Sequence, residues 1–115
     1  MKACLALCEG RHEMPDCVEG SIFRNELNPT DLASMRDTAS AKLEDVDTLD
    51  LYVTGLTVAL GEVIRLCTER EINLTLWHFD RNTGEYYPQT ILRYNCSFCG
   101  TRFLHTWYCP ECGAI

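Results

Sequence analysis

The 115-residue sequence has no apolar run that approaches the length of a membrane-spanning helix, which excludes a transmembrane segment. No signal peptide is visible either, because the apolar stretch after Met1-Lys2 is short and is interrupted by Glu9 and Arg11. Internal repeats and low-complexity linkers are also missing. We therefore expect a cytoplasmic protein with one ordinary domain, or one short domain with an appendage.

Basic residues are scarce: ten Lys and Arg stand against 17 Asp and Glu, which gives a net charge of −7. Proteins hold nucleic acids mainly through cations that neutralise phosphates. The composition therefore argues against a general nucleic-acid-binding surface, although it permits a local basic pocket. The 46% apolar and 23% charged content is typical of a globular chain.

Cysteine is abundant, with eight residues, and four of them form two C-x-x-C pairs near the C-terminus. Cysteines three apart in a tight turn are poorly placed for structural disulfides and well placed to bind one metal ion. Each pair precedes a glycine, which permits such a turn. The two pairs predict a closed tetrahedral site for one structural Zn²⁺, with four ligands: Cys96, Cys99, Cys109 and Cys112.

Residues 94–115 are predicted to form a zinc ribbon, because about residues 94–113 resemble zinc-ribbon modules. The second pair is also similar to a rubredoxin knuckle, so iron is the alternative metal. Near the four cysteines Arg93 and Arg102 carry the only Lys or Arg charges, and Glu111 adds a negative charge. We therefore expect the ribbon to stabilise the fold rather than to bind nucleic acid. The remaining cysteines are expected to be reduced, buried thiols rather than a second metal site: Cys4, Cys8, Cys17 and Cys67.

Residues 1–93 alternate between strand and helix patterns. Strands are predicted at 3–7, 22–23, 49–54, 72–79 and 85–94, and helices from 28–31 to 43 and over 57–71. Asn28 is the expected cap of the first helix and Pro29 its first residue, with Leu32 on the buried stripe. Residues 80–84 suggest a hairpin turn, and Pro88 implies an edge strand or a bulge. The order predicts an α/β fold: a small, Rossmann-like, mostly parallel sheet with two helices and an antiparallel edge hairpin.

Polar residues gather where the predicted strands end, and ligands of open α/β sheets bind beyond the carboxyl ends of the strands. Gly55 permits a tight turn into a helix whose free N–H groups attract anions. Arg11 can grip a phosphate or carboxylate through two hydrogen bonds. The expected ligand contacts are Glu9, Arg11, His12, Thr54, Gly55, Thr57, His78 and Asp80.

Structural roles compete with this interpretation. Thr57 is equally suited to capping a helix, and Arg11 to a surface salt bridge with Glu9 or Glu13. His78 is alternatively directed into the sheet on the face of the neighbouring leucines, while Trp77 and Phe79 are expected to be core rather than a stacking platform.

The stretch Tyr52-Val53-Thr54-Gly55-Leu56-Thr57, with the helix and strand that follow, resembles one unit of the CRISPR-associated Rossmann fold, found in prokaryotic defence. That resemblance implies a homodimer with a cyclic oligonucleotide near the strand ends. A small α/β domain with a ribbon also looks like proteins of bacteria and their phages.

We therefore expect a binding module that captures a small anionic, nucleotide-like ligand, such as a cyclic nucleotide, to sense or sequester a signal. One alternative is a phosphodiesterase-type hydrolase with His12 or His78 as general acid or base, although no carboxylate pair or triad supports it. Another is a ribbon-mediated adaptor.

Overall fold

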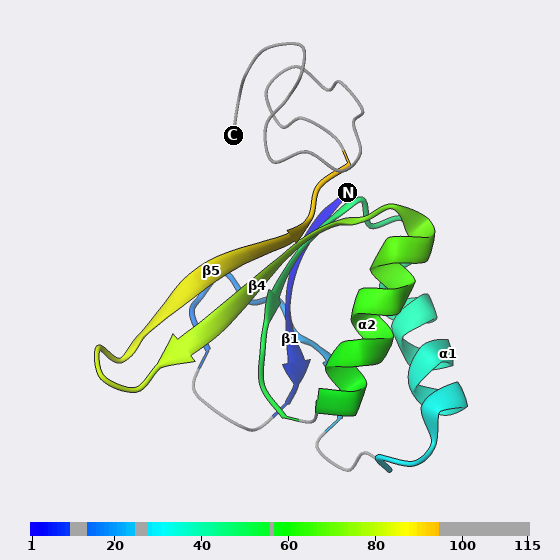
Figure 1. The fold of residues 1–115 in the computed structure, drawn as a ribbon, viewed down its shortest axis with the longest axis horizontal. Coiled ribbons are helices and arrows are strands. Elements are labelled where there is room, and N and C mark those ends of the chain that lie inside the picture. Colours follow the sequence, from blue (N-terminus) through cyan, green and yellow to red (C-terminus); the bar gives the residue numbers. More distant parts are fainter. Residues whose placement is uncertain (10–13, 25–27, 56, 95–115) are drawn as a thin grey trace.

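The structure, a computed structural model, describes residues 1–9, 14–24, 28–55 and 57–94. It confirms the predicted fold class: an α/β domain with a mostly parallel sheet and an antiparallel hairpin (Figure 1). The elements in chain order are β1 Lys2–Cys8, β2 Ser21–Phe23, α1 Leu32–Lys42, β3 Thr48–Tyr52, α2 Thr57–Arg70, β4 Asn73–Asp80 and β5 Glu85–Leu92. The predicted zinc ribbon lies outside the described residues.

The sheet has the order β2-β1-β3-β4-β5, and its first four strands are parallel. From β1 the chain moves to one side to form β2, and then crosses back through α1 to β3 and through α2 to β4. Both helical crossovers run in the same direction along the sheet, so right-handed connections place both helices on one face. Figure 1 shows α1 and α2 side by side against that face.

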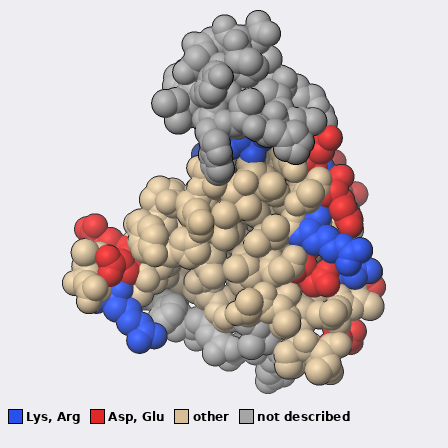
Figure 2. All heavy atoms as spheres, in the orientation of Figure 1, with Lys and Arg blue, Asp and Glu red and all other residues tan. Residues whose placement is uncertain are grey.

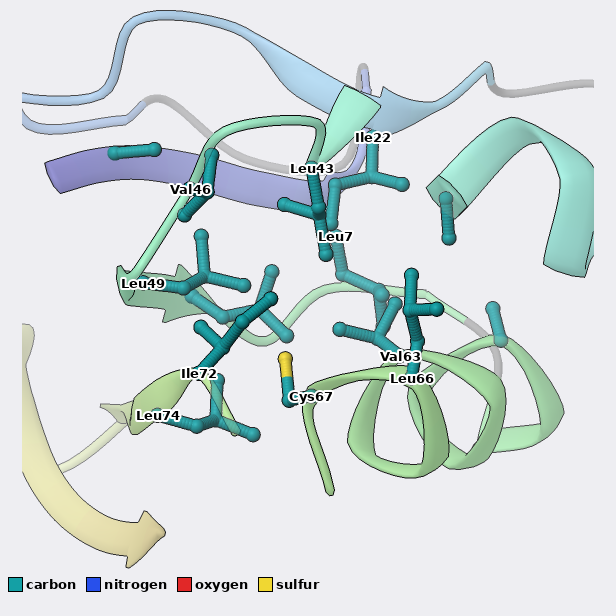
Figure 3. Close-up of a cluster of buried hydrophobic side chains, with 14 of the residues drawn as sticks. Leu7, Ile22, Leu43, Val46, Leu49, Val63, Leu66, Cys67, Ile72 and Leu74 are labelled. Atoms are coloured by element: carbon teal, nitrogen blue, oxygen red, sulfur yellow. The ribbon is translucent and has the colours of Figure 1, made fainter. Parts of the chain in front are cut away.

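A single apolar cluster fills the space between the sheet and the helices. Alternate strand residues point into it, including Leu7, Leu49 and Leu74, and each of these three is 0% exposed. The helices contribute Val63, Leu66 and Cys67 from α2 and Met35 and Ala39 from α1. Figure 3 shows strand and helix side chains meeting in this core, with the sulfur of Cys67 directed inward.

The first helix begins later than predicted. Asp31, not Asn28, is its N-cap: the carboxylate of Asp31 accepts the backbone N–H of Ser34 at 3.1 Å. Asn28 instead accepts the backbone N–H and the hydroxyl of Thr30 in a turn before the helix. Leu32, the first residue of α1, is 43% exposed, so its expected burial was wrong.

The β4–β5 hairpin forms at the predicted place. Gly84 adopts a φ of 73°, which favours glycine, and its N–H donates to the carbonyl of Asp80 at 2.8 Å. Among the described strands β5 pairs only with β4, so Pro88 lies on an edge strand of their sheet, one of the two alternatives that the sequence left open. The hairpin projects from the body of the sheet (Figure 1).

Charged side chains gather at the hairpin tip and along the side of the molecule where the helices lie (Figure 2). Between the helices, Glu62 is 8% exposed and pairs with Arg36, with 3.5 Å between the carboxylate and Nε. No helix formed by the described residues is long and apolar enough to cross a membrane.

Candidate functional site

Three parallel strands end side by side at one rim of the sheet. Cys8, the last residue of β1, is in register with Phe23, the last residue of β2. On the other side of β1, Ala6 is in register with Tyr52, the last residue of β3. The connections from β1 and β3 leave in opposite directions along the sheet, so the rim between them is a topological switch point. Open α/β sheets bind their ligands at such a point.

Thr54 joins the two strands at the switch point. Its hydroxyl donates to the carbonyl of Cys8 at 2.8 Å and accepts the N–H of Cys8 at 3.1 Å. The Thr54 residue is only 4% exposed. The single O–H donor of this side chain is therefore engaged by the protein backbone. The direct role of Thr54 is to hold the end of β1 against the end of β3.

Replacing Thr54 by valine is expected to lower the free energy of unfolding by about 1–3 kcal/mol, because valine has the same shape but cannot make the two hydrogen bonds to the buried backbone of Cys8. Urea denaturation would measure the loss. Thr68→Val is the matched control: its hydroxyl bonds only the Ile64 carbonyl on an exposed helix face, and we expect a loss below about 0.5 kcal/mol. Equal losses in the two variants would contradict this role of Thr54.

Gly55 and Thr57 occupy the positions that the sequence suggested, between β3 and α2. Gly55 has a φ of 90°, a conformation that L side chains rarely adopt, and it is exposed. Thr57 is the first residue of α2 and is also exposed. The first turn of α2 contains no acidic residue. The N-terminus of α2 therefore lies at the rim with no carboxylate of its own to repel an anion.

Glu9 and Arg24 lie at the same rim. The backbone N–H of Glu9 donates to the carbonyl of Phe23 at 3.1 Å, so the chain after β1 stays beside the end of β2. Arg24 directly follows β2 and is exposed. The sequence analysis missed Arg24, because the three-residue strand before it gave a weak signal. The predicted contacts Arg11 and His12 lie outside the described residues.

His78 and Asp80 follow Trp77, the β4 residue in register with the end of β3, and lie on the part of β4 that continues into the β4–β5 hairpin. β3 pairs with β4 only as far as Trp77, and from there β4 continues with β5 alone. The imidazole Nε2 of His78 lies 2.8 Å from Oε1 of Gln89, and its ring lies 5.5 Å from that of Tyr87. The carboxylate of Asp80 accepts the backbone N–H of Asn82 at 2.9 Å. The contacts seen for these two side chains are thus within the hairpin.

The face of the sheet opposite the helices carries an aromatic cluster. Tyr52 stacks on Trp77 with a centroid distance of 5.6 Å, and Tyr86 meets Tyr52 edge-on at 4.9 Å. Phe79 extends the cluster through Tyr86 at 5.3 Å. Tyr52 is only 6% exposed, whereas Phe79 is 40% exposed. Met14 and Cys17, from the connection between β1 and β2, contact Tyr86 and Tyr52 on this face, so the cluster acts as a second small core beneath them.

A groove of about 480 Å³ borders this cluster. Two acidic side chains line it, Asp50 and Glu19, and one basic side chain, Lys2, whose Nζ lies 3.6 Å from the carboxylate of Asp50. Two thiols, Cys4 and Cys17, also line the groove, together with Tyr52 and Trp77 of the aromatic cluster. With two acidic side chains and one basic side chain, this groove would repel an anion, unlike the rim at the switch point.

Within the described part of the chain, no three His, Cys, Asp or Glu side chains come close enough to hold a metal ion together. The four predicted zinc ligands all belong to residues 95–115, outside that part. Comparisons with protein-family models, with curated proteins and with solved structures found no match to this chain.

Proposed function

We propose that the domain is a binding module for a small anionic, nucleotide-like ligand, held at the carboxyl ends of β1, β2 and β3. The observation that carries the proposal is the switch point between β1 and β3, where Gly55 turns the chain into the N-terminus of α2. Backbone N–H groups at such a helix start, aided by the helix dipole, are donors for phosphate or carboxylate. The architecture of the site alone supports this function.

Charge at the rim supports an anion despite the acidic composition of the chain. Arg24 lies next to the end of β1 and supplies a guanidinium, which can contact two phosphate oxygens at once. Arg11, in the connection that follows β1, is the second cation of the proposed site. Glu9 is the acidic residue at this rim. Its carboxylate is suited to accept hydrogen bonds from the hydroxyls or amino groups of a nucleoside.

The resemblance to CRISPR-associated Rossmann folds extends the proposal. In that case the chain forms a homodimer in the cytoplasm, a cyclic nucleotide is the ligand, and the module senses or sequesters a signal. The zinc ribbon is then a structural clip beside the binding domain. A hydrolase is the less favoured alternative, because His78 is bonded within the hairpin and His12 is the remaining candidate acid or base. An adaptor function of the ribbon would appear as partner capture that depends on residues 94–115.

Thermal-shift measurements with linear nucleotides, cyclic nucleotides and inorganic phosphate test the proposal. A ligand at 100 times its dissociation constant stabilises a protein by about 2.7 kcal/mol, so an active compound should raise the melting temperature by several degrees. Arg24→Ala and Arg11→Ala should each abolish the shift. Recovery of the unchanged compound after incubation would separate a binding module from a hydrolase.

Arg65→Ala is the matched control for the arginine variants. Arg65 is exposed on α2 and pairs with Glu69 at 3.2 Å, away from the start of the helix. Its replacement should leave the ligand-induced shift unchanged. A panel in which no compound stabilises the protein, or a shift that survives both Arg24→Ala and Arg11→Ala, would overturn the proposed site.

A further inference from the structure

Two thiols from separate segments meet on the helix-free face of the sheet. Cys4 belongs to β1, and Cys17 lies thirteen residues later in the segment that crosses this face. Their Sγ atoms are 3.5 Å apart, and Sγ of Cys17 is also 3.4 Å from the hydroxyl of Tyr52. The sequence analysis had expected Cys4 and Cys17 to be buried thiols without a shared role. The structure instead leaves Cys17 exposed and Cys4 half-buried.

The backbone fixes the two cysteines close to one another. The N–H of Glu19 donates to the carbonyl of Cys4 itself at 2.9 Å, and the N–H of Ala6 donates to the carbonyl of Gly20 at 2.8 Å. A turn closed by the N–H of Val18 and the carbonyl of Pro15, at 3.0 Å, contains Cys17. The anchored backbone therefore presents both side chains to each other. A disulfide needs the sulfurs about 2.05 Å apart, so they must approach by about 1.5 Å, which side-chain rotation can supply.

We infer that Cys4 and Cys17 form a redox-active pair that closes to a disulfide when the protein meets a disulfide oxidant such as oxidised glutathione. The exposed Cys17 reacts first. Its thiolate attacks one sulfur of the oxidant, the oxidant's S–S bond breaks, and one glutathione thiolate leaves. Cys4, after losing its proton to solvent, attacks the sulfur of Cys17 and expels the second glutathione. The protein loses two protons and two electrons, and the oxidant takes them up to become two glutathione thiols.

The surroundings of Cys4 favour the closed form. Burial, together with the neighbouring Cys17, Asp50 and Glu19, raises the pKa of the Cys4 thiol to about 12. The groups that face the pair are these acids, the Tyr52 hydroxyl and Lys2, which is paired with Asp50. Thiol pairs that are strongly oxidising owe this to a stabilised thiolate in the reduced state. The surroundings of Cys4 do not stabilise its thiolate, so the reduced state has no such advantage here. A disulfide is uncharged, so burial does not disfavour it.

Peptide mapping of the oxidised, full-length, zinc-loaded protein tests the inference. The protein is equilibrated in buffers of reduced and oxidised glutathione, alkylated, and digested with trypsin without reduction. Cleavage after Lys2, Arg11 and Arg24 places Cys4 in peptide 3–11 and Cys17 in peptide 12–24. We expect these two peptides to be joined, and the melting temperature to rise by about 5 °C or more, because the crosslink restricts the unfolded chain.

Variants identify the sulfurs involved. Cys4→Ser should abolish the crosslink and leave a glutathione adduct on Cys17, whereas Cys17→Ser should abolish both products. Peptide 3–11 also contains Cys8, so Cys8→Ser is the matched control and should retain the crosslink. A crosslink that persists in Cys4→Ser and is lost in Cys8→Ser would overturn the assignment. Oxidised protein without any link between the two peptides would overturn the inference itself.

Discussion

Replacing Leu49 by alanine is expected to lower the free energy of unfolding by about 2–5 kcal/mol, a large share of the 5–15 kcal/mol typical of small domains. Leu49 is 0% exposed and lies on β3, the central strand of the sheet, among the side chains of the main core (Figure 3). Its truncation removes apolar contacts and leaves a cavity that the surrounding strands cannot fully close. Urea denaturation followed by circular dichroism would measure the loss.

Leu32→Ala makes the same chemical change at a site that is 43% exposed on α1. Because leucine and alanine are both good helix formers and little surface is buried there, we expect a loss below about 1 kcal/mol. A loss at Leu32 as large as that at Leu49 would mean that the helix packs differently from the described arrangement.

Replacing Cys109 by serine in the full-length chain is expected to abolish stable zinc binding. Four thiolates complete a tetrahedral site, and structural zinc sites of this kind bind with apparent free energies of about 10–16 kcal/mol. A hydroxyl is a far weaker zinc ligand than a thiolate, so the affinity should fall by orders of magnitude. Native mass spectrometry of freshly purified protein, combined with competition by a chromogenic chelator, would measure the metal content.

Cys17→Ser is the control for the zinc experiment, since Cys17 is exposed in the described domain and lies outside the C-x-x-C pairs. This variant should retain one zinc ion per chain and release it no faster than the unmodified protein. Wild-type protein without zinc, or equal zinc loss in the two variants, would contradict the predicted site. Iron in place of zinc would identify the alternative metal through its absorption spectrum.

The order of strands and helices was predictable because the local signals agreed with the fold. Apolar runs marked the strands, an amphipathic pattern marked α2, and Pro88 identified the edge of the sheet. The N-terminus of α1 was not predictable from residue types alone. Asn28 and Asp31 are both good capping residues, and only the path of the chain into the helix decides between them.

The candidate site was predictable only in part, because it depends on strand length and register. Sequence analysis placed Gly55 and Thr57 correctly at a strand-to-helix turn. His78 and Asp80 were grouped with them as polar residues at a predicted strand end, and the structure places both on the part of β4 that continues past the end of β3 into the hairpin. The Cys4–Cys17 contact has no signal in the sequence, since it arises from the return of the chain across the sheet.

Neither edge strand of the sheet that the described residues form is well suited to pair with a further strand. β2 has three residues, and β5 carries Pro88, which has no N–H to offer to a neighbouring chain. Two molecules of this protein therefore have little opportunity to join their sheets into one continuous structure. Any homodimer would instead assemble through side-chain surfaces, so substitutions on those surfaces should separate the subunits while the hydrogen-bonded backbone of each remains intact.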